Sequence, residues 1–120
     1  MKRDFDLIRH IMTDIENMPA ASAFKSFEYP GYDKATIHQH IKLLIDENLI
    51  EGKIHESHHG IDAVRITGLT WNGHDFIDAS KDESIWTKAK ETVLKPTVSI
   101  TFSILLEWLK EEAKKKLGLS

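Results

Sequence analysis

The sequence predicts an α+β fold in which five helices accompany one small antiparallel hairpin. Apolar residues recur at helical spacing in five stretches of the chain, which predicts amphipathic helices. Between the second and third stretches they alternate with polar residues instead, as in strands that bury one face. With 120 residues and no cysteine, the chain is long enough to bury a core without metals or disulfides.

The first helix is predicted over residues 4–18, with Asp4 as its N-cap and Pro19 as its stop. One face is apolar and predicts contact with the core: Leu7, Ile8, Ile11, Met12, Ile15 and Met18. In residues 20–31, aromatic residues precede a Pro-Gly turn. This stretch is compatible with an edge strand or a single helical turn, so we expect a helix there to be abbreviated or missing.

The central helix is predicted over residues 34–47, with Asp33 as its N-cap. Its buried stripe should consist of Ile37, Ile41, Leu44 and Ile45. Its outward face should carry Ala35, Thr36, Gln39, Lys42, Leu43 and Asp46.

A hairpin is predicted directly after the central helix. In its first strand, Ile50, Gly52 and Ile54 point inward and alternate with Glu51, Lys53 and His55. We expect residues 56–62 to form a polar turn and residues 63–66 to return as a second strand. A helix followed by strand, tip and strand is the arrangement of a helix with its wing, so the predicted fold is winged-helix-like.

Three more helices are predicted after the hairpin. The first follows Thr70 as N-cap and ends near residue 79, and the second covers about residues 83–94 and cannot extend through Pro96. The last covers residues 102–117 after Thr101 as N-cap, with Gly118 as its stop.

We expect residues 1–120 to form a single domain. Within it, residues 1–79 should form the winged-helix-like core and residues 80–120 a C-terminal helical extension.

Four sequence blocks occur in order along almost the whole chain: MKRDFDLIRHIM, HIKLLIDENLIEG, GLTWNGHDFIDA and KKLGL. With these blocks the chain resembles an uncharacterised family of small bacterial phage and prophage proteins, a domain of unknown function. The I-x-x-H-I-x-x-L helix that leads into L-I-E-G, and the L-T-x-x-G-x-x-F turn, are similar to winged-helix regulators over residues 33–78. That second resemblance implies a fold that serves either DNA binding or protein interaction.

Double-stranded DNA is the first candidate partner, in a DNA-binding or transcription-regulating role. The nucleic-acid-binding residues would be Lys34, Thr36, Gln39 and Lys42 on the helix, with Lys53 and Arg65 on the wing. Gln39 is the best candidate for base readout, because Gln pairs bidentately with adenine. Between Asp33 and Arg65, however, six Asp or Glu outnumber four Lys or Arg, and phosphate binding favours the opposite sign.

A non-enzymatic protein–protein interaction module is the alternative, with a host or phage protein as its partner. Leu43 points outward from the central helix and would suit a protein contact. The last helix has a broad apolar face, while Ile104 and Trp108 lie nearly opposite that face. Two apolar faces predict either a homodimer through this helix or a helix wedged between neighbours in its own chain.

Other classes of function lack a sequence signal. There is no Gly-rich phosphate loop, nucleophile elbow or H-E-x-x-H motif, so we expect no enzyme, no catalytic residue and no cofactor. His38 and His40 lie about 160° apart around a helix, and the wing histidines lack a carboxylate at ligand spacing, so we expect no metal site. The charged start and the lack of a long apolar run predict a cytoplasmic protein without a membrane segment.

Overall fold

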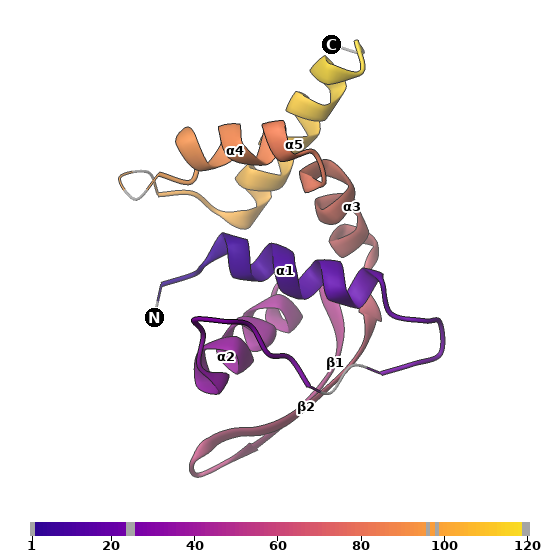
Figure 1. Cartoon of the computed structure of the whole chain (residues 1–120), viewed down its shortest axis with the longest axis vertical. Coiled ribbons are helices and arrows are strands. Elements are labelled where there is room, and N and C mark those ends of the chain that lie inside the picture. Colours follow the sequence, from indigo (N-terminus) through magenta and orange to yellow (C-terminus); the bar gives the residue numbers. More distant parts are fainter. Residues whose placement is uncertain (1, 24–25, 96, 98, 119–120) are drawn as a thin grey trace. The chain divides into compact units, whose positions relative to one another are not determined.

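The computed structural model describes residues 2–23, 26–95, 97 and 99–118. This part of the chain contains five helices and a two-stranded antiparallel sheet (Figure 1), which confirms the predicted α+β class. In order, the elements are α1 (Phe5–Glu16), α2 (Lys34–Asp46), β1 (Ile50–Ser57), β2 (Gly60–Leu69), α3 (Trp71–Ser80), α4 (Glu83–Glu91) and α5 (Phe102–Lys116). The structure divides into two compact units, Met1–His74 and Asp75–Ser120, and the division lies inside α3.

Helix α1 begins as predicted, because the side chain of Asp4 accepts a hydrogen bond from the amide of Leu7 at 3.0 Å. Its buried residues are Leu7, Ile8, Ile11, Met12 and Ile15, which confirms the predicted apolar face up to that point. The helix ends at Glu16, however, so Met18 lies beyond it and is only half-buried.

The connection from α1 to α2 contains neither helix nor strand in its described residues, 17–23 and 26–33. The expected absence of a full helix before α2 is therefore confirmed for these residues. Of the aromatic residues in this stretch, Phe24 lies outside the described part of the chain, whereas Phe27 is buried.

Helix α2 begins at the predicted cap, where Asp33 accepts a hydrogen bond from the amide of Thr36 at 2.7 Å. The burial of Ile37, Ile41 and Leu44 confirms most of the predicted stripe. The prediction for Ile45 was wrong, since this residue is half-buried. On the opposite flank of the stripe, His40 is fully buried instead.

The hairpin is longer than predicted. Ser57 pairs with Gly60, so His58 and His59 alone form the turn, and the predicted turn over residues 56–62 was wrong. Apart from half-buried Ile61, the residues near the tip (55–57 and 60–63) are exposed, so they lack apolar alternation, yet their backbones continue the ladder. In Figure 1 the tip of the hairpin extends beyond α1 and α2 of the same unit.

The junction between β2 and α3 is held by Thr70 and Gly73. The Thr70 hydroxyl accepts from the Gly73 amide at 3.0 Å, as predicted for an N-cap, and donates to the Asn48 carbonyl at 2.6 Å. A side chain on Gly73 would collide with the carbonyl of Leu49. The L-T-x-x-G spacing thus brings the start of α3 tightly against the start of β1.

The second unit contains α4 and α5. In its aromatic core, the centroid of the Phe76 ring lies 6.1 Å from that of the Trp86 ring and 5.1 Å from that of the Phe102 ring. Helix α4 ends at Glu91, earlier than predicted, where the amide of Leu94 bonds back to the carbonyl of Ala89. The predicted stop, Pro96, lies outside the described residues.

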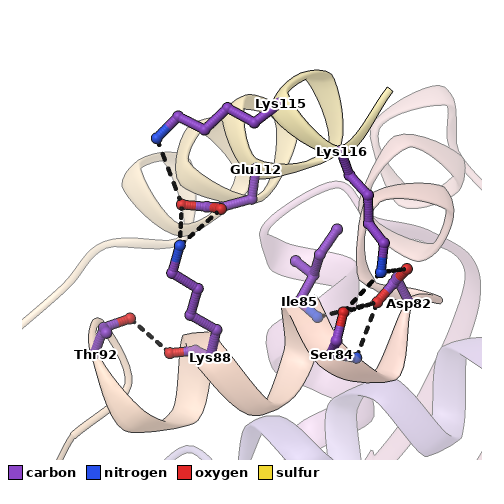
Figure 2. A network of polar contacts seen from close by, with 8 residues as sticks. All are labelled: Asp82, Ser84, Ile85, Lys88, Thr92, Glu112, Lys115 and Lys116. Atoms are coloured by element: carbon purple, nitrogen blue, oxygen red, sulfur yellow. Dashed lines mark hydrogen bonds and ion pairs between the residues drawn. The ribbon is translucent and has the colours of Figure 1, made fainter. Parts of the chain in front are cut away.

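Two groups of ion pairs join α4 to α5 (Figure 2). Lys88 bonds both carboxylate oxygens of Glu112, at 3.0 and 3.1 Å, and Lys115 lies 3.7 Å from the same carboxylate. At the start of α4, Lys116 pairs with Asp82 and also donates to the hydroxyl of Ser84 at 2.8 Å. Helix α5 begins as predicted, with the Thr101 hydroxyl as its cap.

Candidate functional site

The outward face of α2 is the centre of the candidate site. Lys34 and Gln39 are exposed, as the DNA-binding prediction requires of them. Thr36 is half-buried, and its amide donates a hydrogen bond to the carboxylate of Asp33 at 2.7 Å. Hydrogen bonding from Thr36 lowers the pKa of Asp33 and leaves Thr36 engaged in the cap of the helix.

Lys42 is partly engaged by the hairpin. Its Nζ lies 3.4 Å from a carboxylate oxygen of Glu56, and its side chain is 38% exposed. The sequence did not suggest this pair, because Glu56 was expected in a turn and stands on β1 instead. Lys42 therefore helps to orient the hairpin against α2 and has less freedom to meet a phosphate.

Lys53 and Arg65 stand directly opposite each other on the two strands, and both are exposed. Two like charges in facing positions repel each other and destabilise a hairpin. Within the described residues neither of them has a carboxylate partner at ion-pair distance. The hairpin thus presents two neighbouring cations that have no ion-pair partner among the described residues.

Two histidines fix α2 in place, and sequence reasoning missed both roles. Nδ1 of His40 lies 2.8 Å from the carbonyl oxygen of Thr36, while its Nε2 accepts from the amide of Asp4 at 2.9 Å. Nδ1 of His38 lies 3.3 Å from the carbonyl oxygen of Ile61 on β2. No group of three or more potential metal ligands occurs among the described residues.

Two tyrosines hold the segment before α2 against α1. The hydroxyls of Tyr29 and Tyr32 donate to the carboxylates of Asp14 and Asp4, each at 2.6 Å. Burial and the bond to Asp14 raise the pKa of Tyr29 far above its ordinary range. The bond to Asp4, with some burial, raises the pKa of Tyr32 to about 12. No local sequence pattern predicts these long-range bonds.

A groove of about 600 Å³ lies between this segment and the first half of α2, and we call it the α2 groove. The segment contributes Glu28 and Tyr29, among others, to its lining, while α2 contributes Lys34, Ile37 and His38. The groove therefore combines apolar surface with both signs of charge, next to a predicted DNA contact.

The residues predicted for a protein interface are exposed to different degrees. Ile104 on α5 is 56% exposed, whereas Trp108 is half-buried. Leu43 on α2 is half-buried and points outward less fully than its position suggested. Leu117, which the helical spacing assigns to the broad apolar face of the last helix, is largely exposed and lies one residue beyond the end of α5.

A family model described as "Hypothetical protein (DUF2513)" matches residues 2–99. The chain belongs to the DUF2513 family. The matched part of this DUF2513 protein includes both histidines of α2, the hairpin and the α2 groove, but ends before α5.

The DUF2513 chain is also similar to an uncharacterized protein of Haemophilus influenzae. The two are 28% identical over 106 residues, which cover 88% of this chain and 89% of the relative. No solved structure matches the DUF2513 chain. Every helix in its described part is too short or too polar to cross a bilayer.

Proposed function

We propose that the unit Met1–His74 is a winged-helix-like, non-enzymatic module that binds double-stranded DNA. The observation that supports this most strongly is that the cations Lys53 and Arg65 face each other without an ion-pair partner among the described residues. A phosphate between the two cations would replace their repulsion by attraction and would release counterions from the DNA. The exposed hairpin would then act as a wing on the phosphate backbone.

Helix α2 suits the role of the reading element in this proposal. Gln39 is exposed on its outward face, where the amide could pair with an adenine in the major groove. Lys34 is exposed in the first turn and could meet a phosphate. Thr36 and Lys42 have local partners, so we assign base readout chiefly to Gln39.

Three of the six carboxylates between Asp33 and Arg65 have partners within the fold. Asp33 caps α2, Glu56 pairs with Lys42, and Asp62 accepts a hydrogen bond from Ser57. The other three carboxylates, Asp46, Glu47 and Glu51, are exposed, as are the cations Lys34, Lys53 and Arg65, which have no such partner among the described residues. The resemblance to phage and prophage proteins supports a regulatory role in a phage or prophage, inside the bacterial cytoplasm.

Fluorescence anisotropy with a labelled random duplex tests the proposal. We expect binding at low salt that weakens steeply as salt rises, and the double variant Lys53→Gln/Arg65→Gln should reduce the salt slope by about 2. The matched control, Lys95→Gln/Lys114→Gln, removes the same charge from the other unit and should keep the wild-type slope. No binding at low salt, or equal slopes for both double variants, would overturn the proposal.

Exposed Ile104 supports a second candidate, a protein contact through α5. A large apolar side chain more than half exposed gains free energy when a partner covers it, and a second copy of the chain is the simplest partner. We expect the Ile104→Lys variant to lower the mass measured by light scattering from dimer to monomer. A wild-type protein that is monomeric at high concentration would exclude the homodimer.

A further inference from the structure

His38 on α2 is a buried polar side chain in the wall of the α2 groove. It is only 7% exposed, and its Nδ1 faces the carbonyl oxygen of Ile61. A carbonyl can only accept a hydrogen bond, so Nδ1 must carry the ring proton. In the neutral imidazole, Nε2 is then left with a free lone pair.

His38 lines the α2 groove. Its Nε2 has no hydrogen-bond partner among the described residues, whereas every fully buried side-chain nitrogen and oxygen there has one. Nε2 must therefore be reachable by solvent, and His38 is one of the residues that line the groove. An acceptor without a partner, on a largely buried residue of the groove wall, suits a hydrogen-bond donor from a ligand.

The remaining walls define what else the ligand must offer. Lys34 supplies a positive charge and Glu28 a negative charge, while Phe27, Pro30 and Ile37 supply apolar surface. The hydroxyls of Tyr29 and Tyr32 already donate hydrogen bonds to aspartates, so only their rings are available to a ligand. The complementary molecule carries an anionic group, a cationic hydrogen-bond donor and an apolar body.

We propose that the α2 groove binds a free α-amino acid with an aromatic or large apolar side chain. The ammonium group donates to Nε2 of His38 and is balanced by Glu28, and the carboxylate pairs with Lys34. The side chain packs on the aromatic wall. A groove of about 600 Å³ is of the size that small-molecule sites have. This proposal does not depend on DNA binding.

Titration of the whole protein with L-phenylalanine, followed by amide chemical shifts, tests the site. We expect saturable shifts at residues 26–38. The analogue 3-phenylpropionate lacks the ammonium group and phenethylamine lacks the carboxylate, so each should bind at least about tenfold more weakly. The measurement contains no DNA, so its outcome is separate from that of the anisotropy experiment.

A pair of lysine variants then assigns the carboxylate partner. Lys34→Gln should weaken binding of L-phenylalanine about tenfold and leave the weak binding of phenethylamine unchanged. Lys2→Gln removes an exposed charge from the same unit, outside the groove, and should bind like the wild type. Absence of saturation, equal binding of both analogues and L-phenylalanine, or equal effects of the two variants would overturn the proposal.

Discussion

Nε2 of His40 accepts a hydrogen bond from the backbone amide of Asp4 at 2.9 Å, across 36 positions of the sequence. The same imidazole donates from Nδ1 to the carbonyl of Thr36. Because a backbone amide only donates and a carbonyl only accepts, both ring nitrogens are assigned and the imidazole is neutral. His40 thereby joins the start of α1 to α2, which carries the candidate site.

Replacement of His40 by alanine should destabilise the first unit. The variant leaves the Asp4 amide without its acceptor and opens a cavity at a fully buried position, which together should cost about 2–4 kcal/mol. Urea unfolding followed by circular dichroism measures this loss. The control His55→Ala removes an exposed histidine from β1 and should change the free energy of unfolding by less than about 0.5 kcal/mol. Equal effects would contradict the role assigned to His40.

Gly73→Ala should also destabilise the protein. Its new methyl group would meet the carbonyl of Leu49, so α3 would have to move away from β1 at a cost of about 1–3 kcal/mol. Gly68→Ala is a matched control, since its methyl group would meet no atom within 4 Å. Thermal unfolding of both variants measures the difference, and a Gly73→Ala protein as stable as Gly68→Ala would refute the packing argument.

The sequence predicted those parts of the fold that depend on local chemistry. Asp4, Asp33 and Thr101 were recognisable as caps because a cap bonds an amide within three residues of itself. The buried stripes of α1 and α2 followed from helical periodicity. The length of the hairpin did not, because near its tip the ladder joins residues that, apart from half-buried Ile61, are exposed and leave no periodic signal.

The candidate site was predictable only in part. Exposure of Gln39, Lys53 and Arg65 followed from their places opposite apolar neighbours. Two sets of contacts could not be inferred: the ion pair between Lys42 and Glu56, and the hydrogen bonds by which Tyr29 and Tyr32 hold their segment to α1. Each contact joins residues at least 14 positions apart, and no spacing rule links them. The bonds of Tyr29 and Tyr32 tie to α1 the segment that forms one wall of the α2 groove.

Tyr32 should make the stability of the first unit depend on alkaline pH. Its pKa is raised to about 12 in the folded protein, above the value of about 10 in an unfolded chain. The stabilising bond to Asp4 is therefore complete below about pH 10 and is lost as the pH rises through 12. The free energy of unfolding should exceed that of Tyr32→Phe at neutral pH, and the gap should close over this range. Tyr29 titrates in both proteins, so its effect cancels.

Lys116 should control the ionisation of Asp82 in the second unit. Hydrogen bonds from Lys116, from Ser84 and from the amide of Ile85 hold the pKa of Asp82 far below its ordinary range. A lowered pKa in the folded state stabilises the protein at pH values above the pKa of an unfolded aspartate, about 3.9. This stabilisation is lost as the pH falls. Lys116→Gln removes the largest cause, so carboxyl NMR should show Asp82 titrating at a higher pH than in the wild type.

Lys114→Gln, which removes a neighbouring charge paired with Glu111, should leave the titration of Asp82 as it is in the wild type. Identical titrations of Asp82 in the two variants would mean that Lys116 does not hold this carboxylate in solution.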